Sequence, residues 1–552
     1  MSRLVTTILS LALFAAAFFS ISDRVPERAA QHPSRSGAME ALEFWSEARS
    51  YPDNNLPPDK YYRAFEWARK AELKKKPLPF AGSGWTYIGP SNLSGRMLAV
   101  ALNPLNPNTI YAGSASGGFW RSHTGGVSGD WERVSTGYPV LGVAAIAIDP
   151  GDSNVIYIGT GEVYRYAGTA GGLVVRTTRG SYGMGILKTT DGGATWTKSL
   201  DWSYNQERGI QAIRLNPHNP STVWAATTEG IYLSTDGGGN WTNILPVQMG
   251  QDIVIHPGDT LKLLVSAGNL GLSNSVVKST DGGSAWFAVT PTDFSGKTLL
   301  AQYASNPDVV YASIADSTTG VGSLWRTDNF GDSWTELSNN TTNNIFGVQG
   351  WYSHFVAVHP EDSNIVFHAG VPASRSTNGG ITFSGSGGTY SDHHAYAYDP
   401  TDPDILYVAN DDGIYRSDNF GQNFTQVSDN LATGQFYNGF SNSAGDPQIA
   451  LGQVQDHIPG YLFTGSSYWP LSAVDEVGWT GIDQSNDFIM YAGTRNGGAI
   501  RKSTDRGLSF GAAGGGFSGL SCWNAPFVVS PSSPNVLYFG RSRIYKSTTS
   551  AA

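Results

Sequence analysis

Ser279-Thr280-Asp281-Gly282-Gly283-Ser284-Ala285-Trp286 is the clearest copy of a motif that this chain repeats. Close copies end at Trp196 and Trp241, an interval of about 45 residues, and looser copies continue as far as Phe510. A repeat of this length with several short strands indicates a β-propeller or a linear array of blades. The sequence therefore predicts one supersecondary unit used many times, with any functional site where the units converge.

A second repeated signal divides the chain into units. A polar residue and a proline, as in Asn103-Pro104 and Asp149-Pro150, precede a short turn and an apolar pair that ends in an aromatic residue. The signal continues to Ser530-Pro531, which gives ten units, and each unit before the last has four short strands. Four antiparallel strands form one propeller blade. We predict an all-β protein that folds as a single large β-propeller of ten blades. A smaller ring with extra blades in a second domain is the alternative.

The two ends of the repeat predict how the ring closes. The tenth unit has only three strands, and the segment from Trp85 to Ile88 resembles the fourth strand of other units. Pairing of this N-terminal strand with the C-terminal sheet near Tyr545 would remove the exposed edges that an open array leaves. We therefore expect this strand to complete the last blade.

The aspartate of the motif is expected to be structural. Its carboxylate can accept backbone N–H bonds within a tight turn, and glycines such as Gly193 supply the positive φ angles. A catalytic site is asymmetric, whereas this motif recurs, and one aspartate with two glycines offers too few oxygen ligands for calcium. The expected structural aspartates are Asp191, Asp236, Asp281, Asp328, Asp418 and Asp505.

The composition argues against several classes of function. The chain of 552 residues has a net charge of -10, and only 14% of its residues are charged. These values argue against nucleic acid as a main partner. Cys522 is the only cysteine, so neither an intrachain disulfide nor a cysteine-based metal site is expected. We expect no metal and no cofactor.

The first 83 residues differ from the repeats. Residues 1–22 combine an early positive charge, an apolar run and small residues, as an export signal does; a membrane anchor is the alternative. Residues 23–83 are interpreted as a linker and a helical hairpin, which either packs on the main domain or docks a partner. Residues 84–552 form the propeller. We expect a secreted, cell-surface or periplasmic protein with no membrane span once the signal is removed.

The motif Ser-Thr-Asp-Gly-Gly-x-x-Trp resembles the Asp-box, or BNR repeat, of sialidase-like and sortilin-like propellers. The ten-unit count resembles sortilin-type rings, and segments such as Asp392-His393-His394 resemble secreted bacterial Asp-box proteins labelled glycosyl hydrolases. This resemblance implies the propeller fold and a glycan or peptide ligand. The chain departs from two of these families. The Arg-Ile-Pro signature of sialidases is absent, and Ala115 stands where xyloglucanase-type propellers place a catalytic aspartate.

Candidate site residues gather in the later units. Half of the ten histidines fall in the sixth to eighth units, and propeller sites usually lie at the mouth of the central channel, where concave polar and aromatic surfaces bind ligands. The catalytic candidates are Asp392, His393, Asp456 and Tyr352. The ligand-binding candidates are Trp351, His354, His394, Asn410, Asp411, Gln435, Tyr437 and Glu476.

Three chemistries fit these residue types. Glycoside hydrolysis needs two carboxylates, which the aspartates can supply, with Trp351 or Tyr352 as a surface for sugar stacking. Elimination from a uronate polymer needs a base and an acid near a cation, for which His393 or His394 with Tyr352 and an arginine would serve. A metal site at Asp392, His393 and His394 is disfavoured because adjacent residues of a strand point to opposite faces.

The sequence thus leads to two classes of function. We expect a glycan-active protein, first a glycoside hydrolase and second a polysaccharide lyase. The alternative is a non-catalytic scaffold that grips a peptide or a glycan in its channel. A monomer is expected in either case, with no nucleic-acid partner.

Overall fold

The computed structural model describes most of residues 37–552. The residues outside the description are 1–36, 53–56, 58, 75–86, 169–173, 274–275, 292–294, 438–439, 458–459, 473–477 and 552. The expected export signal, the strand start at Trp85 and the candidate Glu476 therefore lie outside the described residues. The helices are α2 (Gly37–Ser50), α3 (Lys60–Lys74) and a short 3-10 turn at Arg495–Gly497.

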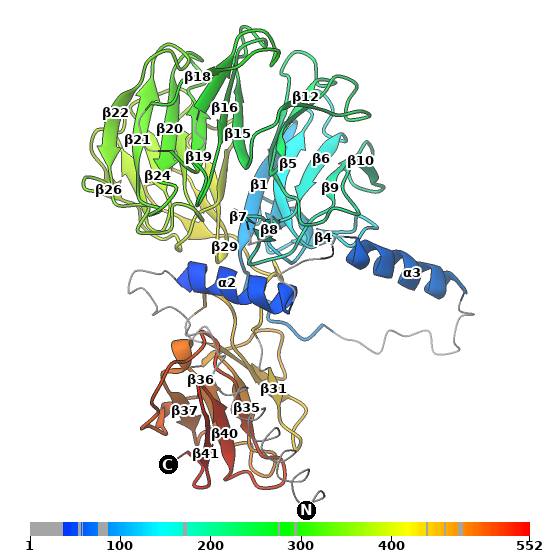
Figure 1. Ribbon diagram of the computed structural model, residues 1–552, viewed down its shortest axis with the longest axis vertical. Helices are drawn as coiled ribbons and strands as arrows, with labels where there is room; N and C mark the ends of the chain where they lie inside the picture. The colour runs from blue at the N-terminus through cyan, green and yellow to red at the C-terminus, as the bar shows by residue number, and fades with distance from the viewer. Residues whose placement is uncertain are drawn as a thin grey trace, which may run out of the picture. The chain divides into compact units, whose positions relative to one another are not determined.

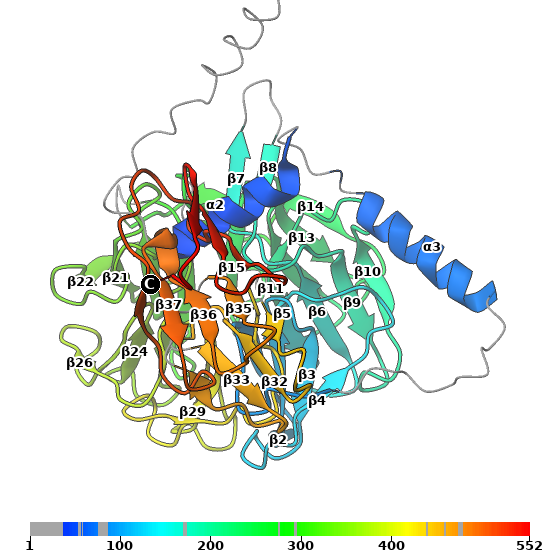
Figure 2. The same cartoon turned by 90° about the horizontal axis from the view of Figure 1, so that it is seen from below.

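Ten antiparallel sheets follow the helices, nine of four strands and one of three, so the all-β propeller fold is confirmed. Within a sheet, consecutive strands pair in chain order (Figure 1). The second sheet has the order β5-β6-β9-β10, with a separate hairpin of β7 (Arg165–Gly168) and β8 (Val174–Thr177) inserted. Figure 2 shows β5, β6 and β9 side by side. The innermost strands of the first seven sheets are β1 (Met97–Asn103), β5 (Val143–Ile148), β11 (Ile210–Leu215), β15 (Gly250–Ile255), β19 (Thr298–Gln302), β23 (Phe355–Val358) and β27 (Ala395–Tyr398).

The outer strands of these seven sheets are β2 (Asn106–Ser114), β3 (Phe119–Ser122), β4 (Glu132–Val134), β6 (Ile156–Thr160), β9 (Gly185–Thr189), β10 (Thr197–Asp201), β12 (Val223–Thr227), β13 (Gly230–Ser234), β14 (Thr242–Leu245), β16 (Leu263–Ala267), β17 (Val276–Ser279), β18 (Phe287–Ala288), β20 (Val310–Ala315), β21 (Gly322–Thr327), β22 (Thr335–Asn339), β24 (Val366–Ala369), β25 (Ala373–Ser376), β26 (Ser384–Gly385), β28 (Leu406–Asn410), β29 (Gly413–Ser417) and β30 (Thr425–Gln426). The last three sheets contain β31 (Ser441–Asn442), β32 (Ile449–Gly452), β33 (Gly460–Thr464), β34 (Leu471–Ser472), β35 (Thr480–Ile482), β36 (Met490–Gly493), β37 (Ile500–Ser503), β38 (Gly511–Ala513), β39 (Phe527–Val529), β40 (Leu537–Gly540) and β41 (Ile544–Ser547).

The first seven sheets form a closed ring. Each innermost strand packs on the next, and β27 packs back on β1. In the remaining sheets, β31 packs on β35 and β35 on β39. The expectation of ten blades in one ring is therefore replaced by a ring of seven sheets and a row of three. The ring closes early because the seventh sheet is the one whose apolar face fits the first.

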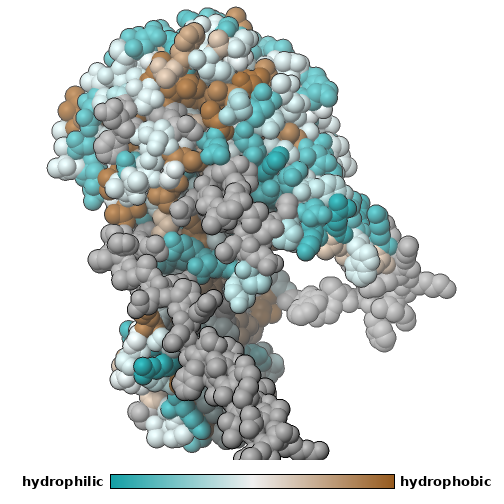
Figure 3. Space-filling view, viewed as in Figure 1, coloured by the Kyte–Doolittle hydropathy of each residue, from teal (hydrophilic) through white to brown (hydrophobic). Residues whose placement is uncertain are grey.

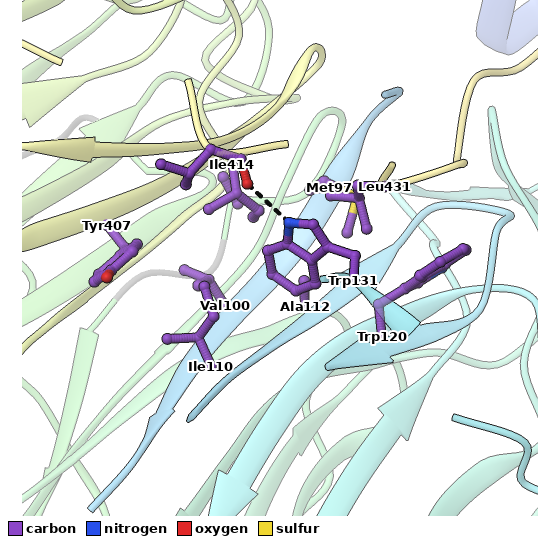
Figure 4. Packing of buried hydrophobic residues seen from close by; sticks show 11 residues of the cluster. Met97, Val100, Ile110, Ala112, Trp120, Trp131, Tyr407, Ile414 and Leu431 are labelled. Atoms are coloured by element: carbon purple, nitrogen blue, oxygen red, sulfur yellow. Dashed lines mark hydrogen bonds between the residues drawn. The ribbon is translucent and has the colours of Figure 1, made fainter. Parts of the chain in front are cut away.

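Figure 4 shows the apolar cluster that closes the ring. Met97 and Ile110 of the first sheet are fully buried against Ile414 and Leu431 of the seventh. Trp131, only 6% exposed, donates its indole N–H to the carbonyl of Val427 at 2.8 Å. Residues about 300 positions apart are thus joined by an aromatic side chain that buries a large apolar area and satisfies its one polar group.

The N-terminal strand does not complete the tenth sheet within the described residues. That sheet has the three strands β39, β40 and β41. The carbonyl of Ile88 instead accepts a bond from the indole of Trp469 at 2.8 Å, and the amide of Ser91 donates to the carbonyl of Ser467 at 2.7 Å. The chain that precedes β1 is therefore fixed to the turn between β33 and β34 of the eighth sheet.

The repeated motif forms the expected turn. In the second sheet, Oδ1 of Asp191 accepts bonds from the Thr189 hydroxyl at 2.7 Å and the Thr195 amide at 2.9 Å. The Thr195 hydroxyl and amide are the main reason that the pKa of Asp191 falls to about 2. Gly193 has a φ of 95° and accepts the indole N–H of Trp196. The same acceptor role is held by Asp236, Asp281 and Asp505.

Asp328 and Asp418 do not hold this role, which corrects the sequence assignment. In the fifth sheet the acceptor is Oδ1 of Asn329, which receives the Thr327 hydroxyl at 2.8 Å, and Asn419 is equivalent in the seventh sheet. Asp328 and Asp418 instead form ion pairs of 2.7 Å with neighbouring arginines. In every one of these turns the acceptor is two residues after the serine or threonine whose hydroxyl it receives. The side-chain carbonyl oxygen of asparagine can take the place of the aspartate oxygen.

Among the described residues, no helix is both long and apolar enough to cross a lipid bilayer. On the face that Figure 3 shows, hydrophilic residues cover much of the ring, with hydrophobic residues scattered among them. Scattered apolar residues are ordinary for a folded protein surface.

The assignment of Asn329, and not Asp328, as the acceptor of its turn can be tested by substituting each of these two adjacent residues. Asn329→Ala removes an acceptor and is expected to lower the free energy of unfolding by about 1 kcal/mol. Asp328→Ala removes a largely exposed carboxylate and should change it by less than about 0.5 kcal/mol. Urea denaturation of both variants checks this, and an equal or larger effect of Asp328→Ala would contradict the one-residue shift.

Ring closure gives the second prediction. Trp131→Ala should lower the free energy of unfolding by about 3–5 kcal/mol, because it removes a buried aromatic side chain at the closing interface. Tyr468→Ala is the matched control, since Tyr468 is 62% exposed. Denaturation monitored by fluorescence compares the two variants. Similar small effects would show that this cluster does not hold the ring closed.

Candidate functional site

A central channel lies between the seven innermost strands of the ring. Its volume is about 460 Å³, and every innermost strand contributes lining residues. Small side chains such as Ala99 and Ala145 keep it open. Inside it, Arg214 donates to the buried carboxylate of Asp252 at 2.6 Å. His394 lines one part of the channel, and through this residue the channel adjoins a cluster of charged groups.

Polar side chains from several loops meet beside His394. Innermost strands of a propeller run in the same direction, so the segments that precede them lie at one end of the ring. Arg96 precedes β1, Tyr352 precedes β23, and Asp392 precedes β27. Turns of other strands bring further residues to the same place. We define the mouth cluster as Arg96, Glu162, Tyr164, Arg179, Tyr352, Asp392, His394, Asp411 and Asp456.

Arg96 and Glu162 form a deeply buried ion pair of the cluster. The guanidinium donates to both carboxylate oxygens, at 2.7 and 3.0 Å, and the two side chains are 1% and 2% exposed. The Tyr164 hydroxyl adds a bond of 2.6 Å to Glu162. Although burial acts in the opposite direction, Arg96 lowers the pKa of Glu162. Glu162 is thus an ionised and fully partnered group, suited to positioning Arg96 rather than to proton transfer.

Arg179 connects the carboxylates of Asp411 and Asp456. It donates to Asp456 at 3.1 Å, lies 3.7 Å from Asp411, and stacks over the ring of Tyr352 at 4.5 Å. The Tyr352 hydroxyl donates to both oxygens of Asp411, at 2.7 and 2.9 Å. Nε2 of His394 is 2.6 Å from Asp411, and burial holds the pKa of His394 well below its ordinary value. A neutral His394 therefore donates its Nε2 proton to Asp411.

Asp392 and Asp456 are the carboxylates of the cluster that reach solvent. The Asp456 side chain is 21% exposed, and Asp392 is partly exposed. Burial and the negative charges of Asp411 and Asp456 raise the pKa of Asp392 well above its usual range. Burial also raises the pKa of Asp456, opposed by Arg179 and assisted by Asp411. Close carboxylates cannot all ionise easily, so the cluster favours the protonated form of Asp392 more than water does.

Both aspartates have a left-handed backbone conformation. Asp392 has a φ of 62° and Asp456 a φ of 61°. Aspartate adopts this region more readily than most residues other than glycine, because its short side chain can bond to the local backbone. Gln349 and Ser353 each donate to Asp392 at 3.1 Å, and Gln455 donates to Asp456 at 2.7 Å. These bonds hold the two carboxylates in place.

Three guanidinium nitrogens of the cluster are buried without a hydrogen bond to any described residue. They are Nη1 of Arg96 and Nε and Nη1 of Arg179. Buried donors normally have acceptors. These three atoms are enclosed by the cluster, so the guanidinium groups serve to hold its carboxylates and offer no open surface to a ligand.

Helix α2 covers one side of the mouth cluster. Its residues Ala38 and Leu42 pack on Tyr164, Trp351 and Tyr352. Trp351 is only 1% exposed, so its ring faces α2 and offers no open surface for sugar stacking. Tyr352 is equally buried but contacts the charged groups, as described above.

Tyr437 likewise lies beneath α2. Its ring stacks on Trp45 at 6.1 Å and contacts Trp523 edge-on at 5.2 Å. Gln435 is close by in sequence, and its carbonyl accepts the amide of Gln455 at 2.8 Å. The ring of Tyr437 is thus occupied by contacts within the protein, whereas the bond given for Gln435 involves only its backbone, and its side-chain oxygen is buried without a hydrogen bond to a described residue.

Three further candidates fill structural positions away from the cluster. His393 bonds to the carbonyl of Gly370 at 2.8 Å and to the Thr389 hydroxyl at 2.9 Å, and it is fully buried. His354 bonds to Ser313 at 2.8 Å, while Asn410 donates to Thr389 at 3.2 Å. His393 and His394 point to different partners, as the alternation of strand residues predicted. Among the described residues, no group of three or more histidine, cysteine or acidic side chains is arranged to hold a metal.

The sequence reasoning missed Arg179 and Lys297. Arg179 follows the β7–β8 hairpin, which lengthens the second unit between β6 and β9, and this extra length was the available signal. Lys297 precedes β19 and donates to the carbonyl of Tyr352 at 2.6 Å. A lone lysine in a turn carries no signal in sequence.

The fold is that of a β-propeller protein, and solved structures resemble it. A GH74 enzyme from Niastella koreensis has a TM-score of 0.60 and 19% identity, covering 85% of this chain and 73% of its own. A GH74 xyloglucanase from Xanthomonas campestris has a TM-score of 0.52 and 16% identity, covering 84% and 79%. An ancestral GH74 enzyme has a TM-score of 0.58 and 15% identity, covering 84% and 69%. At these identities the similarity shows the fold alone.

Searches by sequence give no further assignment. No family model matches the chain, and no curated protein matches it.

Lys297 gives a prediction of pH dependence. Burial lowers its pKa from 10.5 to about 7. Between these values the unfolded chain binds more protons than the folded protein, so the contribution of this group to stability rises with pH. Lys297→Met removes the buried charge, and its stability relative to wild type should be highest below pH 7 and fall as the pH approaches 10.5. Thermal unfolding from pH 6 to 10 measures this.

The control for this measurement is Lys262→Met, because the side chain of Lys262 is 40% exposed. Its difference from wild type should stay constant over the same pH range. A constant difference for Lys297→Met as well would contradict the lowered pKa.

Proposed function

We propose that this protein is a glycan-active β-propeller, a glycoside hydrolase-like enzyme whose reacting groups are Asp392 and Asp456 of the mouth cluster. The observation that carries the proposal is the meeting of three carboxylates from separate loops, one of which has a pKa raised well above its usual range. The pKa of Asp456 is raised as well, so the acid and the base are distinguished by their partners and not by opposite shifts. Two carboxyl groups near one another are the pair that glycoside hydrolysis requires.

The proposed roles follow from protonation and exposure. Asp392 carries the proton and gives it to the oxygen of the leaving sugar as the general acid. Asp456, fixed by the guanidinium of Arg179 at 3.1 Å, takes the proton of the attacking water as the general base. Asp411 is held between Tyr352 and His394, and its negative charge raises the pKa of Asp392.

One structural neighbour is a xyloglucanase, but the proposal does not assign the catalytic aspartate of xyloglucanase-type propellers to this protein. Ala115 stands at the position where the sequence resemblance implies a catalytic aspartate. It is buried, and its carbonyl accepts the amide of Ser181 at 3.1 Å. The acid in this protein therefore has to come from another segment, for which Asp392 is the candidate. The expected export through residues 1–22 and the monomeric state remain part of the proposal, and no described residue bears on either.

A non-catalytic scaffold is the second candidate. The observation in its favour is that Glu162 and Asp411 are saturated by partners within the protein, while α2 covers Trp351 and Tyr352. A protein with this arrangement would bind a glycan or peptide at the mouth without cleaving it.

Hydrolysis of a polysaccharide panel tests the proposed function. Wild type should release reducing sugar from at least one neutral polysaccharide. Asp392→Asn and Asp456→Asn should each lower the rate by roughly 100-fold or more, the range that general acid–base catalysis contributes. Asp418→Asn is the matched control, because this carboxylate is 69% exposed in an ion pair at the turn after β29.

The binding of the same polysaccharides separates the two candidate functions. If wild type binds a glycan and releases no sugar from it, the scaffold is favoured. If both aspartate variants hydrolyse a substrate as fast as wild type, the assignment of the acid and the base is wrong. Circular dichroism of each variant shows whether a loss of activity comes from a loss of fold.

A further inference from the structure

A cavity outside the mouth cluster lies between the two helices and the ring. Its volume is about 390 Å³, which falls in the range of roughly 300–1,000 Å³ typical of small-molecule sites. Arg49 of α2 and Tyr61 of α3 line one side, and Leu141, Tyr182 and Glu207 from loops of the ring line the other. The chemistry described for the mouth cluster uses none of these residues.

The lining combines flat apolar surfaces with a few polar groups. Tyr61 is 53% exposed and Leu141 is 37% exposed, so both surfaces are open to solvent. Tyr182 lies under the guanidinium of Arg49, whose central carbon is 5.7 Å from the ring centroid. Gln206, which is 6% exposed, adds an amide. Aromatic rings beside amide and carboxylate groups are suited to a ligand with an apolar face and a rim of hydroxyls.

The charges of the cavity favour a neutral ligand. Arg49 brings one positive charge and Glu207 one negative charge. Two N–H groups of Arg49 already donate to the carbonyls of Thr178 and Gly180, at 3.1 and 2.7 Å. Glu207 also lines the cavity. Its carboxylate can accept a hydroxyl from a ligand, and its charge repels an anion.

One glycine separates this cavity from the mouth cluster. Gly180 lines the cavity, and a Cβ added at Gly180 would lie 2.1 Å from Oε2 of Glu162 and 2.6 Å from the carbonyl of Ala115. The wall between the two sites is thus a single backbone segment, Thr178 to Tyr182, whose Arg179 belongs to the cluster. A ligand bound in the cavity would therefore lie close to a ligand bound at the mouth cluster.

We propose that this cavity is a second sugar-binding subsite, which holds a neutral oligosaccharide unit against Tyr61 and Tyr182 with a hydroxyl bonded to Glu207. The proposal rests on the proposed function in that both sites would bind the same glycan chain. It also gives the helical segment a role, since α2 and α3 supply one wall of the subsite.

The affinity of the full-length chain for oligosaccharides tests the subsite. The probes are cellohexaose, xylohexaose, laminarihexaose and mannohexaose, with oligogalacturonate as the anionic comparison, measured by isothermal titration calorimetry. Wild type should bind at least one neutral hexaose more tightly than oligogalacturonate. Tyr182→Ala and Glu207→Gln should each weaken that binding by about tenfold or more. Trp67→Ala is the matched aromatic control on α3, because Trp67 is 74% exposed and does not line the cavity.

The design separates this proposal from the proposed function. If Asp392→Asn abolishes hydrolysis while Tyr182→Ala and Glu207→Gln bind the hexaose as wild type does, the subsite is wrong and the enzyme stands. If Asp392→Asn changes nothing but both cavity variants bind weakly, the subsite stands and the acid assignment fails. Tighter binding of oligogalacturonate than of every neutral probe, or no binding of any probe by wild type, overturns the subsite.

Discussion

The contact between the first and the seventh sheet is the constraint on which the rest of the structure depends. Trp131 and its apolar neighbours join residues about 300 positions apart, which closes the ring and covers the apolar faces of the first and seventh sheets. Closure also sets the channel, because seven innermost strands then face one axis. Without this contact, the loops that carry Arg96 and Asp411 would not be held next to each other.

The mouth cluster shows what closure makes possible. Arg96 precedes the first strand of the ring, while Asp411 follows β28 of the last sheet, and Asp456 comes from the eighth sheet. Burying so many charges is costly unless they are paired. The ion pairs Arg96–Glu162 and Arg179–Asp456 offset that cost, whereas burial and the charges of Asp411 and Asp456 raise the pKa of Asp392.

The sequence pattern predicted the blades well and their assembly less well. The spacing of turns depends on local hydrogen bonds, such as those of Asp191, so four-stranded sheets could be read from the chain. The pattern was defined by aspartate, so it did not predict Asn329 and Asn419 as the acceptors, although the side-chain oxygen of asparagine accepts the same hydrogen bonds. Blade number in a ring depends on which sheets fit each other, and a local repeat carries no information on that.

The sequence by itself determined the all-β repeat and the chemistry of the turns, because these depend on residue types at short range. It also identified Asp392, Asp411 and Asp456 of the later units as candidate site residues. Only the tertiary structure decided that the ring closes at the seventh sheet and that α2 buries Trp351 and Tyr437. It also decided that Arg179 stands between two carboxylates. These features depend on packing between segments far apart in the chain, where shape and burial select partners that no local pattern specifies.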